Sequence, residues 1–244
     1  MCGRYTLKSD PQQIVAEYDV TAVALRDGAI SPLSSPLIQA TELPRESLRE
    51  NFNVAPTTYI PAIINQDGQR TLATFSWGLV PSWSKDPAIG TRMINARVET
   101  ITEKPSYRSA IKSRHCIIPA NGWYEWEQVG SKKVPHYFSS PTQELVSFAG
   151  IFEKWVAPDG FELWSTTIIT TQAREDISAI HDRMPLLINP DMRQAWLDGD
   201  ASTISALLDQ DQSLTPIVQW EVSSLVGNVR NNGPSLIEPE QALF

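Results

Sequence analysis

The chain has 244 residues, of which 41% are hydrophobic, and a formal net charge of −8. This length and composition predict a single domain over residues 1–244 with a sizeable core, and the acidic balance argues against non-specific binding to polyanions. No run of eighteen apolar residues occurs and the first twenty residues contain three carboxylates, so we expect neither a membrane span nor a signal peptide.

Cys2 is the first candidate for chemistry along the chain. If Met1 is removed, Cys2 presents an α-amine and a thiol on adjacent carbons. Such a 1,2-aminothiol condenses with an aldehyde to an imine, which the thiol closes into a thiazolidine ring. An α-amine has a pKa of about 7.7–8.0, against about 10.4 for lysine, so far more of it is unprotonated near neutral pH. The alternative is a frayed terminus in which Cys2 has no role.

The N-terminal part of the chain combines three predicted elements. A helix is expected to begin near Asp10-Pro11. Residues 21–44 are rich in Ser, Pro and small residues, which predicts a loop insertion on the surface. Two apolar runs at 59–64 and 71–77, joined by a turn at Asp67-Gly68, predict a β-hairpin.

The rest of the chain is predicted to consist mainly of strands. Apolar runs predict strands at 115–119, 122–126, 146–152, 161–170 and near Val218. Helices are expected at 104–112, 190–196 and 202–208. The eight Trp and eighteen Pro, against only twelve Gly, are typical of many short strands with firm turns.

Polar residues interrupt these patterns at three places. Asn95 lies in a segment that mixes polar and apolar residues without strand alternation, so its side chain is expected to have a specific partner. Glu125 lies between Tyr124 and Trp126 in a predicted core strand, where its carboxyl either faces solvent or lies in a cleft with a raised pKa. Residues 181–183 place three ionisable side chains in a row.

Several common signatures are absent from the sequence. It contains no P-loop and no G-x-S-x-G, H-E-x-x-H or G-x-G-x-x-G motif. His115, Cys116, His136 and His181 match no zinc spacing. We therefore expect no metal and no organic cofactor. Two cysteines are too few for a disulfide framework, which favours a reducing, cytoplasmic compartment.

Eight short blocks together give a specific signal. They are CGR at 2–4, NVAP at 53–56, WG at 77–78, PSW at 81–83, NARVET at 95–100, GWYEW at 122–126, HDRMP at 181–185 and GNVR at 227–230. With these blocks the chain closely resembles the SRAP family, named for "SOS response-associated peptidase". The resemblance implies an α+β fold whose mainly antiparallel, curved or barrel-like sheet is flanked by short helices.

The resemblance also implies a function. It points to a sensor of abasic sites in single-stranded DNA, which captures the ring-opened sugar aldehyde at C1′ as a thiazolidine DNA–protein crosslink and so shields the lesion. Cys2 would be the nucleophile through its amine and its thiol, and Asn95 would position the terminus and the sugar. Glu125 would shuttle protons, and His181 would act as acid or base near O4′ and assist crosslink reversal. Considered one at a time, these residues have simpler explanations: Asn95 as a turn residue, Glu125 as half of an ion pair and His181 as a structural hydrogen-bonding residue.

For DNA, the resemblance implies phosphate contacts from arginines and stacking from apolar residues in loops. The phosphate candidates are Arg4, Arg97 and Arg183, with Lys132, Lys133 and Arg230 as weaker ones, and the base-contact candidates are Pro56, Trp83 and Trp126. The expected partner is single-stranded DNA that contains abasic sites. We expect a monomer without membrane contact, associated with the bacterial nucleoid when bound to DNA.

Two other functions fit the same residues. The first, which the family name suggests, is a thiol peptidase that removes Met1 from its own chain, with Cys2 as nucleophile and His181 or Glu125 as base. The second is a non-covalent module for single-stranded DNA in which Cys2 is idle. Covalent capture requires a free Cys2 amine and an aldehyde. Peptidase activity requires the thiol but no DNA, and a binding module survives Cys2→Ala.

Overall fold

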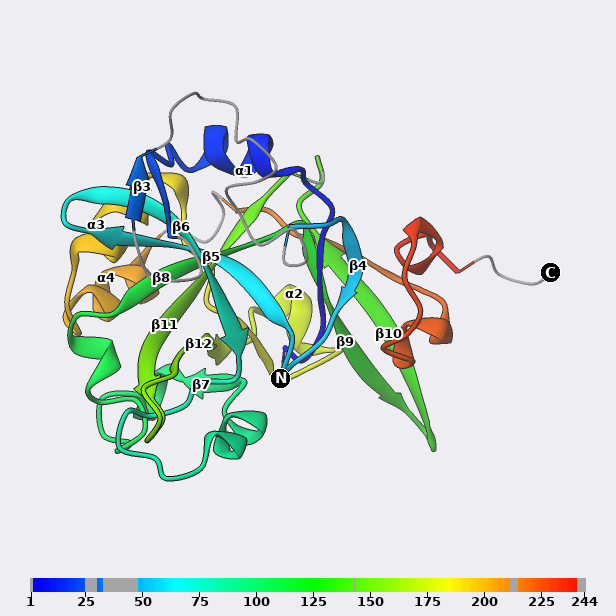
Figure 1. Cartoon of the computed structure of the whole chain (residues 1–244). Coiled ribbons are helices and arrows are strands. Elements are labelled where there is room, and N and C mark those ends of the chain that lie inside the picture. The colour runs from blue at the N-terminus through cyan, green and yellow to red at the C-terminus, as the bar shows by residue number, and fades with distance from the viewer. Residues whose placement is uncertain (1, 25–29, 33–47, 143, 211–214, 241–244) are drawn as a thin grey trace.

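The structure is a computed structural model that describes residues 2–24, 30–32, 48–142, 144–210 and 215–240 (Figure 1). Two β-sheets and several short helices make up this part of the chain. The expected α+β fold with a curved, mainly antiparallel core is confirmed.

The larger sheet closes into a five-stranded ring. Its strands are β5 (Tyr59–Gln66), β6 (Gln69–Trp77), β8 (His115–Ala120), β11 (Val146–Val156) and β12 (Glu162–Gln172). They follow the order β6-β5-β8-β11-β12, and β12 returns to β6 through a short parallel pairing in which Thr166 faces Trp77. The predicted hairpin at 59–77 is therefore confirmed as β5 and β6 and forms one wall of this barrel.

Short strands extend the barrel at its ends. β7 (Asn95–Arg97) and β13 (Arg183–Pro185) lie on opposite edges of the last residues of β12, because Thr170 pairs with both Arg97 and Pro185. β2 (Ala22–Ala24) pairs with β6 and with β3 (Ile30–Pro32). The stretch at 21–44 that the sequence predicts to be a loop thus contains two strands. Its remaining residues, 25–29 and 33–44, lie outside the described residues.

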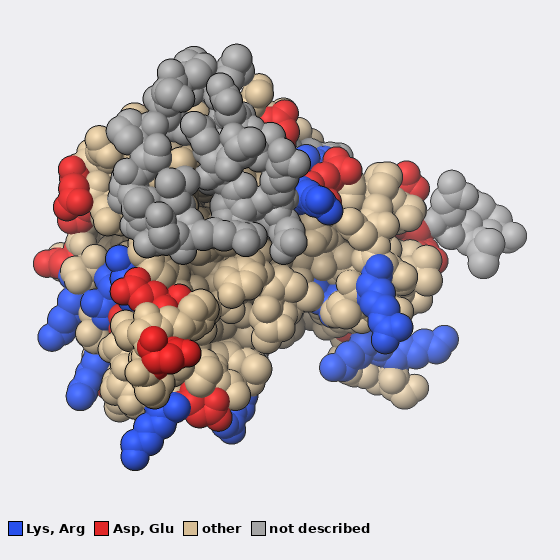
Figure 2. Space-filling model, viewed as in Figure 1, with Lys and Arg blue, Asp and Glu red and all other residues tan. Residues whose placement is uncertain are grey.

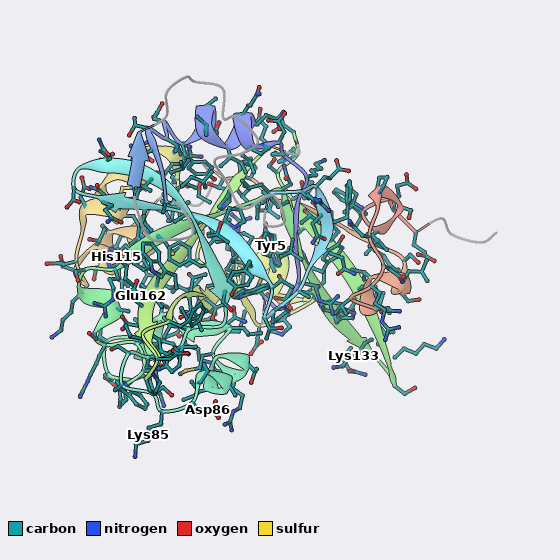
Figure 3. The ribbon with its side chains drawn as sticks, viewed as in Figure 1. Tyr5, Lys85, Asp86, His115, Lys133 and Glu162 are labelled. Carbon is teal, nitrogen blue, oxygen red and sulfur yellow. The ribbon has the colours of Figure 1, made fainter. Side chains whose placement is uncertain are left out.

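The smaller sheet has the order β14-β10-β9-β1-β4. Its strands are β1 (Tyr5–Leu7), β4 (Asn51–Val54), β9 (Gly122–Val129), β10 (Lys132–Ser139) and β14 (Val218–Glu221). β9 and β10 form a long hairpin that extends away from the barrel, with Lys133 near its end (Figures 1 and 3).

The helices are all short. They are α1 (Pro11–Glu17), α2 (Glu175–Ser178), α3 (Arg193–Asp198) and α4 (Thr203–Asp209), with 3-10 turns η1 (Pro87–Arg92), η2 (Val98–Thr100), η3 (Ala110–Lys112), η4 (Pro190–Met192), η6 (Ser224–Gly227) and η7 (Pro234–Leu236). No helix in the described part of the chain is long and apolar enough to cross a membrane.

Two helix predictions need correction. Residues 104–112 form successive turns that end in η3, and the amides of Tyr107 and Arg108 both bond to the carbonyl of Lys104. The helix expected at 190–196 begins as the 3-10 turn η4 and becomes α-helical only in α3.

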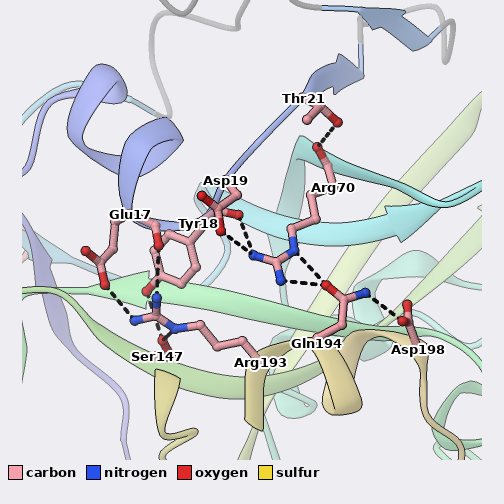
Figure 4. A network of polar contacts seen from close by, with 9 residues as sticks. All are labelled: Glu17, Tyr18, Asp19, Thr21, Arg70, Ser147, Arg193, Gln194 and Asp198. Atoms are coloured by element: carbon pink, nitrogen blue, oxygen red, sulfur yellow. Dashed lines mark hydrogen bonds and ion pairs between the residues drawn. The ribbon is translucent and has the colours of Figure 1, made fainter. Parts of the chain in front are cut away.

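A polar network fastens α1 to the barrel and to α3 (Figure 4). The buried guanidinium of Arg193 donates to the Glu17 carboxylate at 2.8 Å and lies 4.4 Å from the centre of the Tyr18 ring. Arg70 on β6 donates to Gln194 on α3. Capping of α1 by Asp10, whose side chain accepts from the amides of residues 12 and 13, confirms the predicted helix start.

The two sheets share one hydrophobic core. Tyr5 of β1 is fully buried near the middle of the molecule (Figure 3) and contacts Trp77 and Phe148 of the barrel edge to face. Trp123 of β9 also packs against Phe148. Because β1 and β9 are pressed against the barrel in this way, the chain segment before β1 lies where the two sheets meet.

Candidate active site

Cys2 is fully buried just before β1. Asn95 on β7 donates from its Nδ2 to the Cys2 carbonyl at 2.8 Å, so the start of the chain is tied to the end of the barrel. Burial and the nearby Glu125 carboxyl raise the pKa of the Cys2 thiol well above its ordinary value. The thiol is therefore protonated at neutral pH.

Glu125 faces the same place from β9. Its residue is only 2% exposed, so the structure selects the buried alternative over the solvent-facing one. Burial raises the pKa of the Glu125 carboxyl to about 7, and the Asp182 carboxylate acts in the same direction. Glu125 is thus close to half protonated at neutral pH, as a group that both gives and takes protons should be.

His181 lies between α2 and β13. Its Nε2 is 3.8 Å from Glu125 Oε2, and its Nδ1 is 3.0 Å from the backbone nitrogen of Arg183. Burial lowers the pKa of His181 below its ordinary value. The ring is therefore mainly neutral near pH 7, and its Nε2 faces the carboxyl that titrates there.

Asn95 holds one free acceptor. While Nδ2 is bonded to Cys2, the Oδ1 atom is buried and has no hydrogen-bond partner among the described residues. A buried acceptor without a partner costs free energy of about 1–3 kcal/mol. It is therefore suited to a donor supplied by a ligand or by a mature chain terminus.

The four residues predicted as catalytic meet at one place. Cys2 and Glu125 come from the smaller sheet, whereas Asn95 and His181 come from strand ends on the two edges of β12. Segments 93 and 56 residues apart in the chain are joined by the Asn95–Cys2 and His181–Glu125 contacts. Among the described residues no cluster of three or more His, Cys, Asp or Glu could hold a metal ion.

The predicted DNA contacts differ in exposure. Trp83 is 59% exposed and Arg97 is exposed, whereas Pro56 and Trp126 are partly buried. Lys and Arg side chains lie both at the β9–β10 hairpin and on the lower left of the molecule, where Asp and Glu are interspersed with them (Figure 2).

Two of the predicted phosphate contacts have partners within the protein. Arg4 donates to Asn53 Oδ1 at 2.8 Å and to the Val226 carbonyl at 2.9 Å. Arg183 donates to both carboxylate oxygens of Glu99 at 2.6 and 3.0 Å. To contact phosphate, each arginine would have to bind it alongside its protein partners or give those partners up.

Asn53 and Glu99 are polar residues to which the sequence analysis assigned no role. Asn53 Nδ2 lies 3.3, 3.0 and 2.9 Å from the carbonyl oxygens of Val226, Asn228 and Asn231, and so holds this loop against β4. Both residues lie inside the sequence blocks NVAP and NARVET. Their position in those blocks was a signal that they have a role. It did not predict their partners, which lie far along the chain.

Comparisons with known proteins identify the family and the fold of this chain. Residues 1–229 match the family described as SOS response associated peptidase (SRAP). Abasic site processing protein YoqW of Bacillus subtilis is 38% identical over 98% of this chain and 99% of its own length. Abasic site processing protein HMCES of Xenopus tropicalis is 31% identical over 78% of this chain and 66% of its own length. A crystal structure of a protein from Bacteroides thetaiotaomicron has the same fold, with a TM-score of 0.80, 23% identity and coverage of 98% of this chain and 100% of that one.

Proposed function

The chain belongs to the SRAP family, and on this premise we propose that it processes abasic sites in DNA by capturing the ring-opened sugar aldehyde through Cys2. The relatives that cover nearly its whole length at 38% identity are named abasic site processing proteins. The observation that carries the proposal is the grouping of buried Cys2 and Glu125 with partly buried Asn95 and His181. Capture requires removal of Met1, because the α-amine of Cys2 must be free.

The proposed reaction balances without an oxidant or a leaving group from DNA. The Cys2 amine nitrogen attacks C1′ of the aldehyde, and the resulting carbinolamine loses water to give an imine. The thiol sulfur then adds to C1′ while its proton passes to the imine nitrogen, which closes the thiazolidine. One water is released for each crosslink. Because this thiol acts late and gives up its proton during addition, the raised pKa of the Cys2 thiol is compatible with the sequence of steps.

The neighbouring groups suit these proton transfers. Glu125, with a pKa of about 7, can protonate the departing hydroxyl of the carbinolamine and take a proton from the amine. His181 is neutral, so its ring can exchange a proton with the sugar O4′ during ring opening. Asn95 Oδ1, which lacks a partner within the part of the chain that the structure describes, can accept from the mature Cys2 amine or from a sugar hydroxyl.

The proposed substrate is single-stranded DNA. Reaction at C1′ requires the ring-opened sugar to reach a fully buried cysteine, which is easier for an unpaired nucleotide than for one held within a duplex. The exposed Trp83 can stack on a neighbouring base, and exposed Arg97 can contact phosphate. Net charge −8 requires such contacts to be local.

Intact-mass measurement tests this proposal. The protein is mixed with a single-stranded oligonucleotide that carries one abasic site, with an undamaged oligonucleotide and Cys2→Ala as controls. We expect a covalent adduct, on protein lacking Met1, only with abasic DNA and intact Cys2. An adduct of full yield with Cys2→Ala would refute the assignment of Cys2. No adduct with a mature Cys2 terminus would refute covalent capture.

Peptidase activity is the second candidate. It would use Cys2 as nucleophile on the Met1–Cys2 bond, with His181 or Glu125 as base. A raised thiol pKa lowers the fraction of thiolate, which favours capture over general proteolysis. To separate self-cleavage from removal of Met1 by a cellular enzyme, the protein is produced in cells whose aminopeptidase is blocked. Loss of Met1 from the purified protein with intact Cys2, but not from Cys2→Ala, would support self-cleavage.

A further inference from the structure

His181 has competing partners at Nδ1. The Arg183 amide, which can only donate, lies 3.0 Å away, while the Arg183 carbonyl and the Asp182 carboxylate, which can only accept, lie 3.2 and 3.1 Å away. If the amide is the partner, the proton of the neutral ring is on Nε2, which faces Glu125. Asp182 is 84% exposed at its side chain, so water competes for its carboxylate. The placement of the Arg183 backbone therefore decides which ring nitrogen carries the proton.

That backbone is held by its own side chain. The Arg183 side chain is 11% exposed, and its guanidinium donates to Glu99 Oε1 at 2.6 Å, to Glu99 Oε2 at 3.0 Å and to the Thr170 carbonyl at 2.7 Å. Two parallel N–H···O bonds to one carboxylate fix orientation as well as distance. β13 is only three residues long, so this ion pair adds a side-chain anchor to the backbone pairing of Arg183 with Gln172 of β12.

The other end of the ion pair lies in the 3-10 turn η2, which directly follows the strand that carries Asn95. Glu99 lies two residues beyond the end of β7, on the opposite edge of β12 from β13. Asn95 in turn holds the Cys2 carbonyl. The Glu99–Arg183 pair therefore spans β12 and links the element that positions Cys2 to the element that positions His181.

We propose that Glu99 is a positioning residue for the reaction: through Arg183 it holds His181 with its proton on Nε2, directed at Glu125, and fixes β7 relative to β13. Glu99 touches neither Cys2 nor Glu125 among the contacts found in the described residues, so it acts through Arg183. The inference rests on the proposed function for its kinetic consequence, but the state of the His181 ring can be measured without DNA.

A different role for Glu99 predicts the opposite result. In that alternative, the only effect of the Glu99 carboxylate is to compete with DNA phosphate for the Arg183 guanidinium, so that phosphate must displace it. Removing the charge would then strengthen DNA binding and accelerate crosslinking. A positioning role predicts slower crosslinking at saturating DNA, whatever happens to affinity.

The test compares Glu99→Gln with wild type and with Glu103→Gln, which removes an exposed carboxylate nearby in the chain. Single-turnover crosslinking is measured at saturating abasic oligonucleotide between pH 5.5 and 8.5, and affinity is measured with an undamaged oligonucleotide. We expect Glu99→Gln to slow crosslinking about tenfold or more and to change the shape of its pH profile, since small misplacements of reacting groups are costly. Its affinity should be unchanged or higher, and Glu103→Gln should match wild type.

Nitrogen NMR of His181 in the protein without DNA gives an independent readout. Wild type should show the neutral ring protonated at Nε2, and Glu99→Gln a mixture of the two tautomers. Arg183→Lys, which cannot form the paired bonds, should shift the ring in the same direction. A crosslinking rate of Glu99→Gln within twofold of wild type or above it, or an unchanged tautomer, would overturn the proposal. If wild type forms no adduct, covalent capture fails, while the NMR result still decides the role of Glu99 in holding His181.

Discussion

Replacing Glu125 with Gln should make the protein more stable at alkaline pH. In the folded state burial raises the pKa of this carboxyl from 4.5 to about 7. In the unfolded chain it titrates near its ordinary value. Between these pH values the folded state holds one more proton than the unfolded state, so stability falls as pH rises. At about 1.36 kcal/mol for each pH unit, the carboxylate costs about 3 kcal/mol once it is fully ionised.

Gln is neutral at every pH and close in shape to a protonated Glu. The unfolding free energy of Glu125→Gln relative to wild type should therefore rise by about 2–3 kcal/mol between pH 5 and pH 8. Other titrating groups are present in both proteins, and their effects largely cancel in this difference. Crosslinking by Glu125→Gln should be slower than by wild type, because the variant gains stability but loses proton transfer.

Urea denaturation at a series of pH values measures this difference directly. Glu162→Gln, which changes an exposed carboxylate on β12 (Figure 3), is the matched control and should alter stability by less than about 0.5 kcal/mol throughout. A relative stability of Glu125→Gln that stays constant between pH 5 and pH 8, or decreases, would show that the burial of Glu125 does not raise its pKa as described.

Three further changes test other parts of the structure. Cys2→Ser should form an imine with abasic DNA but no thiazolidine, so its adduct should survive denaturation only after borohydride reduction; a stable unreduced adduct would contradict the role of sulfur. Gly78→Ala should lower the unfolding free energy by about 1–3 kcal/mol in urea titrations, because Gly78 has φ of 136° and an added Cβ would lie 2.4 Å from the Gly90 carbonyl oxygen; an unchanged midpoint would argue against this close approach. Trp83→Ala should weaken binding of undamaged single-stranded DNA by about 1–3 kcal/mol in anisotropy titrations; equal affinity would place the stacking contact elsewhere.

Local chemistry explains which elements were predictable from sequence. The Asp67-Gly68 turn between two apolar runs predicts the β5–β6 hairpin, and both turn residues adopt positive φ as that turn requires. Pro11 after Asp10 likewise predicts the start of α1. At residues 104–112 the sequence suggests a helix, but the structure forms successive turns in which the amides of Tyr107 and Arg108 share the Lys104 carbonyl.

Tertiary pairing explains what the sequence left open. The pattern around Glu125 could not decide between solvent and core, because that depends on β9 packing against the barrel through Trp123 and Phe148. Arg183 was predicted to contact phosphate from its sequence block alone. Its bidentate partner Glu99 lies 84 residues away, and no local pattern connects the two.

The bond between Arg4 and the Val226 carbonyl has a consequence for biosynthesis. It joins residues 222 positions apart, and the same loop is held by Asn53. A ribosome adding about 5–20 residues per second needs roughly 10–45 s to pass from one to the other. During that interval the Arg4 side chain cannot make this bond, so the start of the nascent chain is not yet fixed in its folded position. On the function proposed above, removal of Met1 therefore has this interval in which to occur before the terminus is fixed.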